Sequence, residues 1–481
     1  MAAKARRSTF NVMLNLGHFL EVLTTYETTG REPAVSCVVV DSREAIASSV
    51  FVALAGEHVD GHDYVAQAFA NGAQAAIVAR PLPGAHTTID LRADQPNTNL
   101  TIQPPMCLVV DDPVVAMQAV AQAWRSRFDL RVVGITGSVG KSSTKELVHS
   151  VLAQQYNTLK SPGNRNSVLG LPPVLLALRP FHQYAVLEMG MYTPGEIARL
   201  CEMAKPAVGV VTMVGPVHLE RAGSLEAIVA AKQELVESLP AGGTAVLNKD
   251  DERVMSMAAH TPAQIFTYGL NPNADLWADR IHSMGLEGIR FTLHYGRETL
   301  NIQVPLIGRH SVHTALRATA VGLVEGLSWE TILAGLSNSR AQLRLVAVPG
   351  PHGSTIIYDT YNSSPDSAMA ALNLLHDLDG RRLAVLGDML ELGYMEESSH
   401  RLVGRRAADV AQILVTVGPR GRWIGEEALK VGMARDRVFM VADVATAVST
   451  LQQIIAPRDM ILIKGSLGMN MSRIVAALGE G

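Results

Sequence analysis

Apolar positions along the chain change, near residue 130, from short isolated runs to a regular alternation of strand and helix patterns. Residues 130–135 form a short β-branched run, and a glycine turn follows. Residues 141–156 then place four apolar side chains on one helical face: Leu147, Val148, Val151 and Leu152. A strand, a glycine turn and a helix in this order form half of a βαβ unit. Near-continuous apolar runs predict further buried strands of a mostly parallel sheet at 184–187, 208–212, 244–247 and 265–268.

A second alternating series begins near residue 355. Its helical stretches of about 10–15 residues separate short apolar runs, as in a doubly wound, Rossmann-like domain. The predicted strands lie at 355–358, 383–386, 413–417, 438–441 and 460–463. The join to the preceding region lies near 338–345.

The first hundred or so residues are less regular. Apolar runs at 37–40, 50–53 and 75–79 alternate with turn-rich segments, and residues 81–105, rich in Pro, Thr and Asn, predict a loop. We place a domain boundary near residues 112–113, after this loop. The chain of 481 residues fits three domains of roughly 100–200 residues each. We therefore expect an α/β protein with domains at 1–112, 113–338 and 339–481.

Composition and charge exclude several classes of protein. Hydrophobic residues make up 48% and charged residues 18% of the chain, which is typical of a globular protein rather than a disordered one. A net charge of −4 gives no electrostatic reason to expect nucleic-acid binding. No apolar run approaches the roughly 20 residues of a membrane span, and no signal peptide is evident. Three widely spaced cysteines predict neither a disulfide framework nor a structural zinc, so we expect a cytoplasmic protein.

A glycine-rich segment between the first predicted strand and helix is typical of a phosphate-binding loop. It comprises Gly137, Ser138, Val139, Gly140, Lys141, Ser142 and Ser143. Glycines let backbone N–H groups approach phosphate oxygens, the helix N-terminus adds partial positive charge, a lysine reaches the outer phosphates, and a hydroxyl holds Mg²⁺. The strict GxxxxGK[ST] spacing is not met. A glycine turn with a surface lysine is the alternative, but the strand before and the helix after favour the phosphate loop.

Three later residues are candidates for chemistry. Glu188 ends a predicted parallel strand, where a carboxylate faces the ligand crevice and suits Mg²⁺, although it could equally be a solvated strand end. His218 follows the next strand and is either structural or a ligand. Lys232 falls on the apolar face of a predicted helix, so it must snorkel to water, pair with an anion or be modified.

Taken in order, these segments resemble the Mur ligase family over nearly the whole chain. TGSVGKSSTKE is similar to the family's TGxxGKT(T/S)TKE, and SPGNRNSVLGLPPVLLAL to TxGNxNNxIGxPxTLL. LEMGMYTPGEI, GPVHLERAGSLEAIVAAKQEL and VLNKDDE follow in the family's order. DTYNSSPDSAMAAL and LGDMLELG resemble the branch that adds D-alanyl-D-alanine. DSREAIASSVFVALAGEHVDGHDYVAQAFANGA resembles that branch's UDP-binding module.

This resemblance implies a small N-terminal α/β UDP-sugar-peptide module, a central P-loop ATPase and a Rossmann-like C-terminal domain. It also implies an ATP-dependent ligase of peptidoglycan precursor synthesis, and hence a role in cell-wall biogenesis, cell shape and division. ATP phosphorylates the terminal carboxylate of a UDP-N-acetylmuramoyl-tripeptide, and the amine of D-alanyl-D-alanine displaces the phosphate. Mg²⁺ is the implied cofactor. The partners are small molecules, with neither nucleic acid nor membrane, and we expect a monomer.

The resemblance also implies residue roles. The implied catalytic group comprises Lys141, Glu188, His218 and Lys232, with Lys232 matching a family lysine that carries a carbamate. Mg²⁺ ligands would be Ser142, Glu188 and His218. Beyond the loop, ATP contacts would be Thr314, Arg344 and Asp359. Substrate contacts would be Ser42 and Arg43 for the uridine diphosphate, and Asn164, Asn166 and Ser167 for the peptide side.

Four segments of this chain depart from the family pattern, one of them at two positions, Leu467 and Ser472. Thr314 replaces an asparagine that usually contacts adenine, and a hydroxyl lacks the amide's paired donor and acceptor. Ser167 replaces an asparagine, Leu467 an arginine and Ser472 a glutamate, and YNSSP stands for YNANP. Two alternatives therefore stay open beside the D-alanyl-D-alanine ligase. One is a related ligase that joins another carboxylate and amine, and the other is a non-catalytic binding paralogue.

Overall fold

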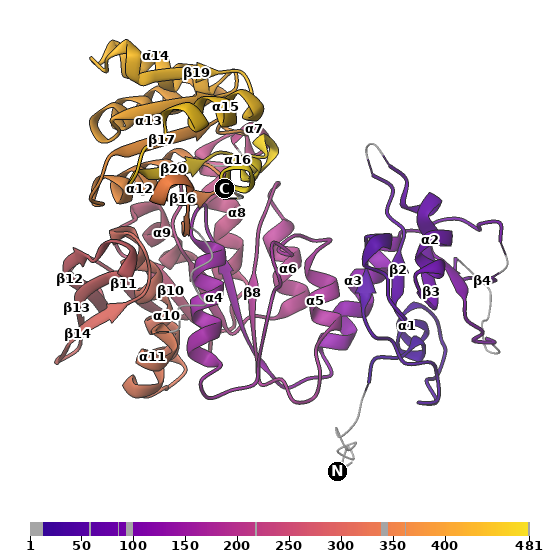
Figure 1. Cartoon of the computed structure of the whole chain (residues 1–481). Helices are drawn as coiled ribbons and strands as arrows, with labels where there is room; N and C mark the ends of the chain where they lie inside the picture. The colour runs from indigo at the N-terminus through magenta and orange to yellow at the C-terminus, as the bar shows by residue number, and fades with distance from the viewer. Residues whose placement is uncertain are drawn as a thin grey trace. The chain divides into compact units, whose positions relative to one another are not determined.

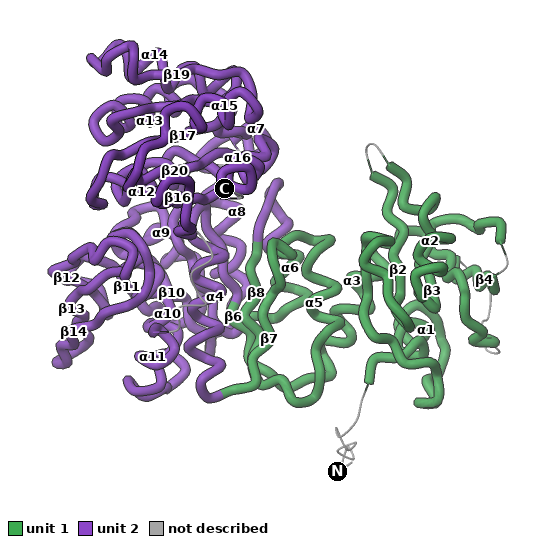
Figure 2. The backbone as a smooth tube through the Cα atoms, viewed as in Figure 1, with its two compact units in different colours: residues 1–133, 156–189, 198–206 green, residues 134–155, 190–197, 207–481 purple. Residues whose placement is uncertain are grey.

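The computed structural model describes residues 13–56, 59–84, 86–92, 100–216, 219–337, 345–360 and 362–479. His218, Arg344 and the predicted join at 338–339 lie outside these residues. The chain divides into two compact units (Figure 2). The first comprises residues 1–133, 156–189 and 198–206, and the second comprises 134–155, 190–197 and 207–481.

The first unit contains a five-stranded sheet with the order β1–β2–β3–β5–β4, in which all neighbours are parallel. The strands are β1 (Val38–Val39), β2 (Val50–Val52), β3 (Ala75–Val78), β4 (Thr87–Asp90) and β5 (Met106–Val109). β4 corrects the expectation of a loop over 81–105. It is an edge strand that buries only Ile89, so its stability comes from backbone pairing with β5 rather than from an apolar pattern.

Helices of the first unit surround this sheet and a second pair of strands. They are α1 (Leu16–Leu23), α2 (Val65–Ala70), α3 (Pro113–Arg125) and α5 (Leu171–Leu176). Trp124 of α3 is fully buried, donates its indole N–H to the Leu178 carbonyl at 3.2 Å and contacts the His18 ring edge-on. β7 (Thr158–Lys160) pairs in parallel with β8 (Tyr184–Glu188), which confirms the strand predicted at 184–187.

Most of a nine-stranded sheet belongs to the second unit, where the strand order is β14–β13–β12–β11–β10–β9–β6. β6 (Arg131–Thr136), β9 (Val208–Val211), β10 (Thr244–Asn248) and β11 (Gln264–Gly269) match predicted strands, and β9, β10 and β11 run parallel. β12 (Leu276–Ser283), β13 (Ile289–Tyr295) and β14 (Glu298–Val304) add an antiparallel extension that the sequence interpretation did not contain. β13 and β14 pair in antiparallel fashion up to Tyr295 and Glu298, and the turn between them contains Gly296 with a positive φ of +57°. This arrangement is typical of a β-hairpin.

Helices of this part include α4 (Lys141–Leu152), α7 (Leu219–Ala222), α8 (Leu225–Glu237), α9 (Glu252–Ser256), α10 (Val312–Val324) and α11 (Trp329–Leu336). Most of α6 (Glu196–Ala204) belongs to the first unit. The four apolar side chains predicted on one face of α4 are all fully buried. α4 ends at Leu152, earlier than the predicted residue 156, and Ala153 caps it with its backbone N–H on the His149 carbonyl. α10 and α11 both pack on α4.

The C-terminal part is a doubly wound domain (Figure 1), as predicted. Its sheet has the order β15–β16–β20–β17–β18–β19, and only β15 is antiparallel to its neighbour. The strands are β15 (Val346–Pro349), β16 (Thr355–Asp359), β17 (Arg382–Gly387), β18 (Ile413–Val417), β19 (Val438–Val441) and β20 (Met460–Lys464).

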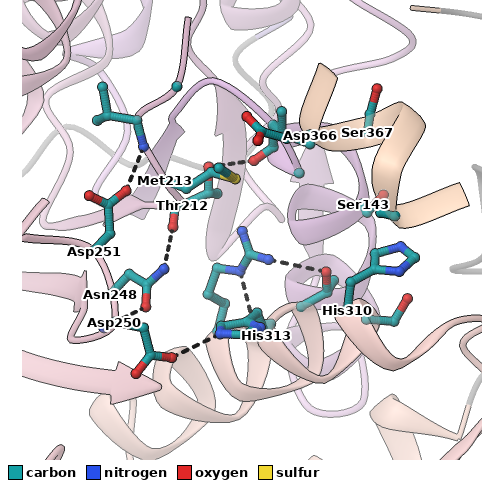
Figure 3. A pocket seen from close by; sticks show the side chains of 18 of the residues that line it. Ser143, Thr212, Met213, Asn248, Asp250, Asp251, His310, His313, Asp366 and Ser367 are labelled. Atoms are coloured by element: carbon teal, nitrogen blue, oxygen red, sulfur yellow. Dashed lines mark hydrogen bonds and ion pairs between the residues drawn. The ribbon is translucent and has the colours of Figure 1, made fainter. Parts of the chain in front are cut away.

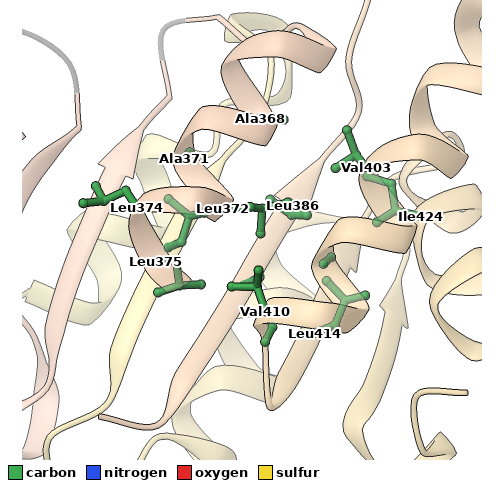
Figure 4. Close-up of a cluster of buried hydrophobic side chains, with 14 of the residues drawn as sticks. Ala368, Ala371, Leu372, Leu374, Leu375, Leu386, Val403, Val410, Leu414 and Ile424 are labelled. Atoms are coloured by element: carbon green, nitrogen blue, oxygen red, sulfur yellow. The ribbon is translucent and has the colours of Figure 1, made fainter. Parts of the chain in front are cut away.

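Alternate residues of these strands face two separate cores. Ala384 and Leu386 of β17 join the core under α12 (Pro365–His376), α13 (Glu396–Val410) and α14 (Gly421–Lys430), part of which Figure 4 shows. Leu383 and Val385 join the opposite core under α15 (Val444–Ile454) and α16 (Ser472–Gly479). Burial on both faces explains the continuous apolar runs. Among the described residues, no helix is both long enough and apolar enough to cross a bilayer.

Candidate functional site

The predicted phosphate loop joins β6 to α4 and depends on two glycines. Gly137 (φ +141°) and Gly140 (φ +88°) both lie in the left-handed region, which favours glycine. A Cβ at Gly137 would collide with the Thr212 hydroxyl, and Gly140 is the N-cap of α4. The loop therefore presents the N-terminus of a twelve-residue helix, with its partial positive charge, to the space beside it.

Hydrogen bonds fix the loop to the segment that follows β9. The Ser138 backbone N–H donates to the Met213 carbonyl at 2.7 Å, and its hydroxyl donates to the Gly215 carbonyl at 2.9 Å. The Thr212 hydroxyl donates to the Val139 carbonyl at 2.7 Å. Lys141 lies back across the loop, with Nζ 2.7 Å from the Gly137 carbonyl oxygen. The loop is therefore held in shape before any phosphate binds, as electrostatic stabilisation of a phosphoryl group requires.

A cavity of about 830 Å³ opens beside this loop within the second unit (Figure 3). Its size is in the range of small-molecule sites. Four loop residues line it: Val139, Gly140, Ser142 and Ser143. Further lining comes from Thr212–Pro216, from the segment after β10, from α10 and from the start of α12. The cavity thus joins the predicted phosphate loop to residues of both the central and the C-terminal sheets.

Two of the ATP contacts implied by the resemblance line this cavity. Thr314 lies on α10, is buried, and accepts a hydrogen bond from Arg317 Nη2 at 3.2 Å. Asp359 ends β16, and Lys464 of β20 donates to Asp359 Oδ2 and to the Asn362 carbonyl, each at 2.8 Å. This buried, hydrogen-bonded ion pair fixes the carboxylate at the edge of the cavity.

Charged groups at the cavity wall form a short network. His313 Nε2 lies 2.9 Å from Asp250 Oδ2. Burial raises the pKa of Asp250, but hydrogen bonds from His313, Leu270 and Asn271 outweigh it, so the net pKa lies below its ordinary value. Burial, together with the positive charge of neighbouring groups, lowers the pKa of His310 to about 4. His310 is therefore neutral at neutral pH, and its ring adds no charge beside the phosphate loop.

Lys232 lies on α8, on its buried face as predicted. The residue is only 2% exposed, so the snorkelling alternative is wrong: the side chain does not reach water. Burial, followed by the nearby charge of Lys141, lowers the pKa of Lys232 well below that of an ordinary lysine. The structure thus brings the two lysines into electrostatic contact, and a neutral or modified amine is favoured over a second ammonium group.

Glu188 ends β8 in the first unit and is 2% exposed, so the alternative of a solvated strand end is also wrong. The Asn166 side-chain amide donates to Glu188 Oε1 at 2.8 Å. Asn166 in turn donates its backbone N–H to the Asn164 carbonyl, and the Ser167 hydroxyl accepts from the Gly170 backbone N–H. The structure therefore brings the predicted peptide-side segment together with the predicted metal ligand.

Family models and curated relatives match this chain over most of its length. "Mur ligase family, catalytic domain" matches residues 34–100, "Mur ligase middle domain" 135–322 and "Mur ligase, glutamate ligase domain" 343–467. A UDP-N-acetylmuramoyl-tripeptide–D-alanyl-D-alanine ligase of Bacillus subtilis is 35% identical over 447 residues, 92% of this chain and 93% of the relative. The chain belongs to the Mur ligase family. The Escherichia coli protein of the same name is 32% identical over 98% of this Mur ligase and 99% of its own length.

Solved structures agree with this Mur ligase fold. A crystal structure of MurF from Acinetobacter baumannii superposes with a TM-score of 0.82 and 29% identity, over 98% of this chain and all of that one. MurF ligase from Thermotoga maritima in complex with ADP superposes with a TM-score of 0.74 and 25% identity, over 92% and 97%. The three-domain α/β architecture predicted from the sequence is therefore confirmed.

Ser42 and Arg43, which the resemblance predicts to contact the uridine diphosphate, lie on the first 3₁₀ helix, Ser42–Glu44. Ser42 is buried and donates its hydroxyl to Gln67 Oε1 at 3.0 Å. The side chain of Arg43 is 81% exposed and forms an ion pair with Asp41 at 2.6 Å. Arg43 holds the pKa of Asp41 below its ordinary value. Water and salt screen an exposed ion pair, so this guanidinium can exchange its surface partner for a bound diphosphate.

Of the three predicted Mg²⁺ ligands, Ser142 and Glu188 lie among the described residues, and both offer oxygen donors. Ser142 is the second residue of α4 and lines the cavity, and Glu188 ends β8. A hydroxyl and a carboxylate suit Mg²⁺, which binds through few protein oxygens together with substrate phosphates. Within the described ranges there is no group of three His, Cys, Asp or Glu side chains that could hold a metal alone. Ser142, which lines the cavity beside the phosphate loop, thus fits a metal bound jointly with a nucleotide.

Sequence reasoning missed several residues that line the cavity, among them Asn248, Asp250 and Arg317. Asn248 ends β10, so its position after a parallel strand was a usable signal. The Asn248 side-chain amide donates to the Thr212 carbonyl at 3.1 Å, beside the phosphate loop. Arg317 follows Thr314 by one helical turn of α10, a spacing that places both on one face.

Replacing Gly137 by Ala should weaken nucleotide binding by about tenfold or more, because left-handed backbone strain and a steric clash both oppose the loop conformation. Gly242→Ala is the matched control, since its Cβ would meet nothing within 4 Å. ADP titration calorimetry on both variants measures the effect. Equal affinities for the two variants would show that the loop does not need this glycine.

Proposed function

We propose that this Mur ligase adds D-alanyl-D-alanine to UDP-N-acetylmuramoyl-tripeptide, with ATP converted to ADP and phosphate. The proposal depends on one observation: the cavity has the phosphate loop that an ATP-dependent ligase needs, and the chain aligns with ligases of that name. A preformed phosphate loop lines the cavity of a chain that aligns over 92% of its length with a ligase of that name. The proposed reaction belongs to peptidoglycan precursor synthesis, and its UDP-linked substrate would place the enzyme in the cytoplasm.

The chemistry explains why the phosphate loop needs positive charge. A carboxylate is a poor electrophile, so its phosphorylation to an acyl phosphate supplies a leaving group for amide formation. Bringing two anions together requires positive charge at the transferred phosphoryl group. Lys141 and the backbone N–H groups at the start of α4 would supply that charge. The attacking amine then forms the new C–N bond and inorganic phosphate leaves with the C–O bond electrons.

Other roles follow from the same proposal. Mg²⁺ would be held by Ser142, Glu188 and His218, and when bound it would neutralise charge on the phosphates. Thr314, Arg344 and Asp359 would contact ATP. Ser42 and Arg43 would contact the uridine diphosphate, and Asn164, Asn166 and Ser167 the peptide side. We assign these sites to domains at 1–112, 113–338 and 339–481, in a monomeric enzyme.

A second candidate is a ligase that joins another carboxylate and amine. The observation that favours it lies in the C-terminal domain, where the side chain of Leu467 is 59% exposed after β20. An exposed apolar residue stands there in place of a family arginine, so the amine substrate could differ in charge or size.

The test is phosphate release from ATP and Mg²⁺ with the UDP-linked tripeptide, in the presence and absence of D-alanyl-D-alanine. We expect release that requires both substrates, with a new amide product seen by mass spectrometry. Release that depends on a different amine would instead support the second candidate. Nucleotide binding with no turnover on any amine offered would support a non-catalytic paralogue.

A further inference from the structure

Arg317 is a buried cation in the wall of the cavity, and no role in the proposed reaction has been given to it. The residue is 6% exposed and lines the cavity from α10. Nε donates to the His313 carbonyl at 2.8 Å, and Nη2 donates to the Thr314 hydroxyl at 3.2 Å. The guanidinium carbon lies 5.8 Å from the centre of the Tyr268 ring. The His313 carbonyl, the Thr314 hydroxyl and the Tyr268 ring together hold the guanidinium in one orientation.

The remaining guanidinium nitrogen faces the phosphate loop. A Cβ built on Gly140 would lie 3.0 Å from Arg317 Nη1, so this nitrogen lies beside the N-cap of α4. Across the described part of the chain, no carboxylate pairs with Arg317 and no acceptor is hydrogen-bonded to Nη1. A buried charge without a counterion costs free energy unless an anion supplies the missing interaction.

Arg125 shows what a purely structural buried arginine looks like in the same chain. It is also 6% exposed, but its three side-chain nitrogens donate to the carbonyls of Ala204, Phe128 and Leu130 at 2.9, 2.9 and 3.0 Å. Its donors are satisfied by the fold. Arg317 satisfies only two of its nitrogens in this way and turns the third toward a cavity.

We propose that Arg317 is a nucleotide-binding residue, with Nη1 donating to an oxygen of the phosphate chain while Nη2 orients the Thr314 hydroxyl. Because Thr314 accepts from Nη2, its own proton is available to donate to a ring nitrogen of the base. Arg317 thereby links the base-contacting residue to the phosphate loop and adds a cation where Thr314 stands in place of an asparagine. The inference rests on the proposed use of ATP and deepens it.

Calorimetric titration of the full chain with ADP and with adenosine tests this role. Arg317→Gln should weaken ADP binding by about 10- to 100-fold and adenosine binding by less than about threefold, since only a charged ligand loses a charge-assisted hydrogen bond. Arg317→Lys should recover part of the loss, because it keeps the charge without the planar fork. The ADP affinity of the wild type should fall more steeply with added salt than that of Arg317→Gln.

Arg125→Gln is the matched control, with a lower melting temperature expected but an unchanged ADP affinity. If Arg317→Gln does not fold, Arg317→Lys and the salt dependence of the wild type carry the test. Unchanged ADP affinity in the Arg317 variants, or equal losses for ADP and adenosine, would overturn the role of Arg317 and leave the ligase proposal intact. A wild type that binds no ADP would overturn both.

Discussion

Replacing Lys141 by Ala should lower kcat about 10³-fold, because one preorganised cation that stabilises transition-state charge contributes on the order of 10²–10³ in rate. Lys141 Nζ now contacts the carbonyls of Gly137 and Ser138 at 2.7 and 3.4 Å, so it already lies over the loop that would cradle the phosphates. A modest turn of this long side chain would bring the ammonium group onto a bound phosphate. Steady-state phosphate release measures kcat, and ADP calorimetry measures binding separately.

Lys430→Ala is the control for Lys141→Ala. Its side chain is 75% exposed at the end of α14, so its loss should leave kcat and ADP affinity unchanged. We expect ADP affinity to fall much less than kcat in Lys141→Ala, because the charge acts mainly on the transferred phosphoryl group. Wild-type turnover in Lys141→Ala would refute the assignment of the phosphate loop.

Lys232→Ala should abolish ligase activity while the protein stays folded. The side chain is buried, and burial, followed by the charge of Lys141, lowers the pKa of Lys232. At neutral pH a larger share of the amine is therefore unprotonated and able to attack CO₂, forming an N–C bond and releasing a proton. The resulting carbamate is an anion, which the Lys141 charge stabilises as strongly as it disfavours a second ammonium group.

Short-chain carboxylic acids should partly restore the activity of Lys232→Ala, since they can place a carboxylate where the carbamate stood. Gln233→Ala on the same helix is the control: Gln233 is hydrogen-bonded to the exposed Glu237, and its loss should leave turnover unchanged. Added bicarbonate should raise wild-type activity in CO₂-depleted buffer but not that of Lys232→Ala. Full activity of Lys232→Ala without additives would remove Lys232 from the mechanism.

Local pattern was a good guide wherever burial acts on both faces of a strand. Most parallel strands of the central and C-terminal sheets were predicted because their side chains are largely apolar, as at β17, where alternate residues enter two cores. β7 was not predicted, since it has only three residues, all partly buried. β4 was missed because its partner strand, β5, lies beyond a polar segment of the chain. Backbone hydrogen bonds between the two strands do not require apolar side chains, so the sequence pattern gave no signal. The hairpin of β13 and β14 carried a turn signal at Gly296 that the interpretation did not use.

By itself, the sequence determined the family, the strand–glycine–helix unit of the phosphate loop and the inward position of Lys232, because each depends on residues close together in the chain. Only the tertiary structure showed that Lys141 and Lys232 influence each other's charge, and that Arg317 turns one nitrogen toward Gly140. Those relations join residues 91 and 177 positions apart. Electrostatic energy depends on distance through space and on burial, and neither quantity exists until the sheets and helices have packed.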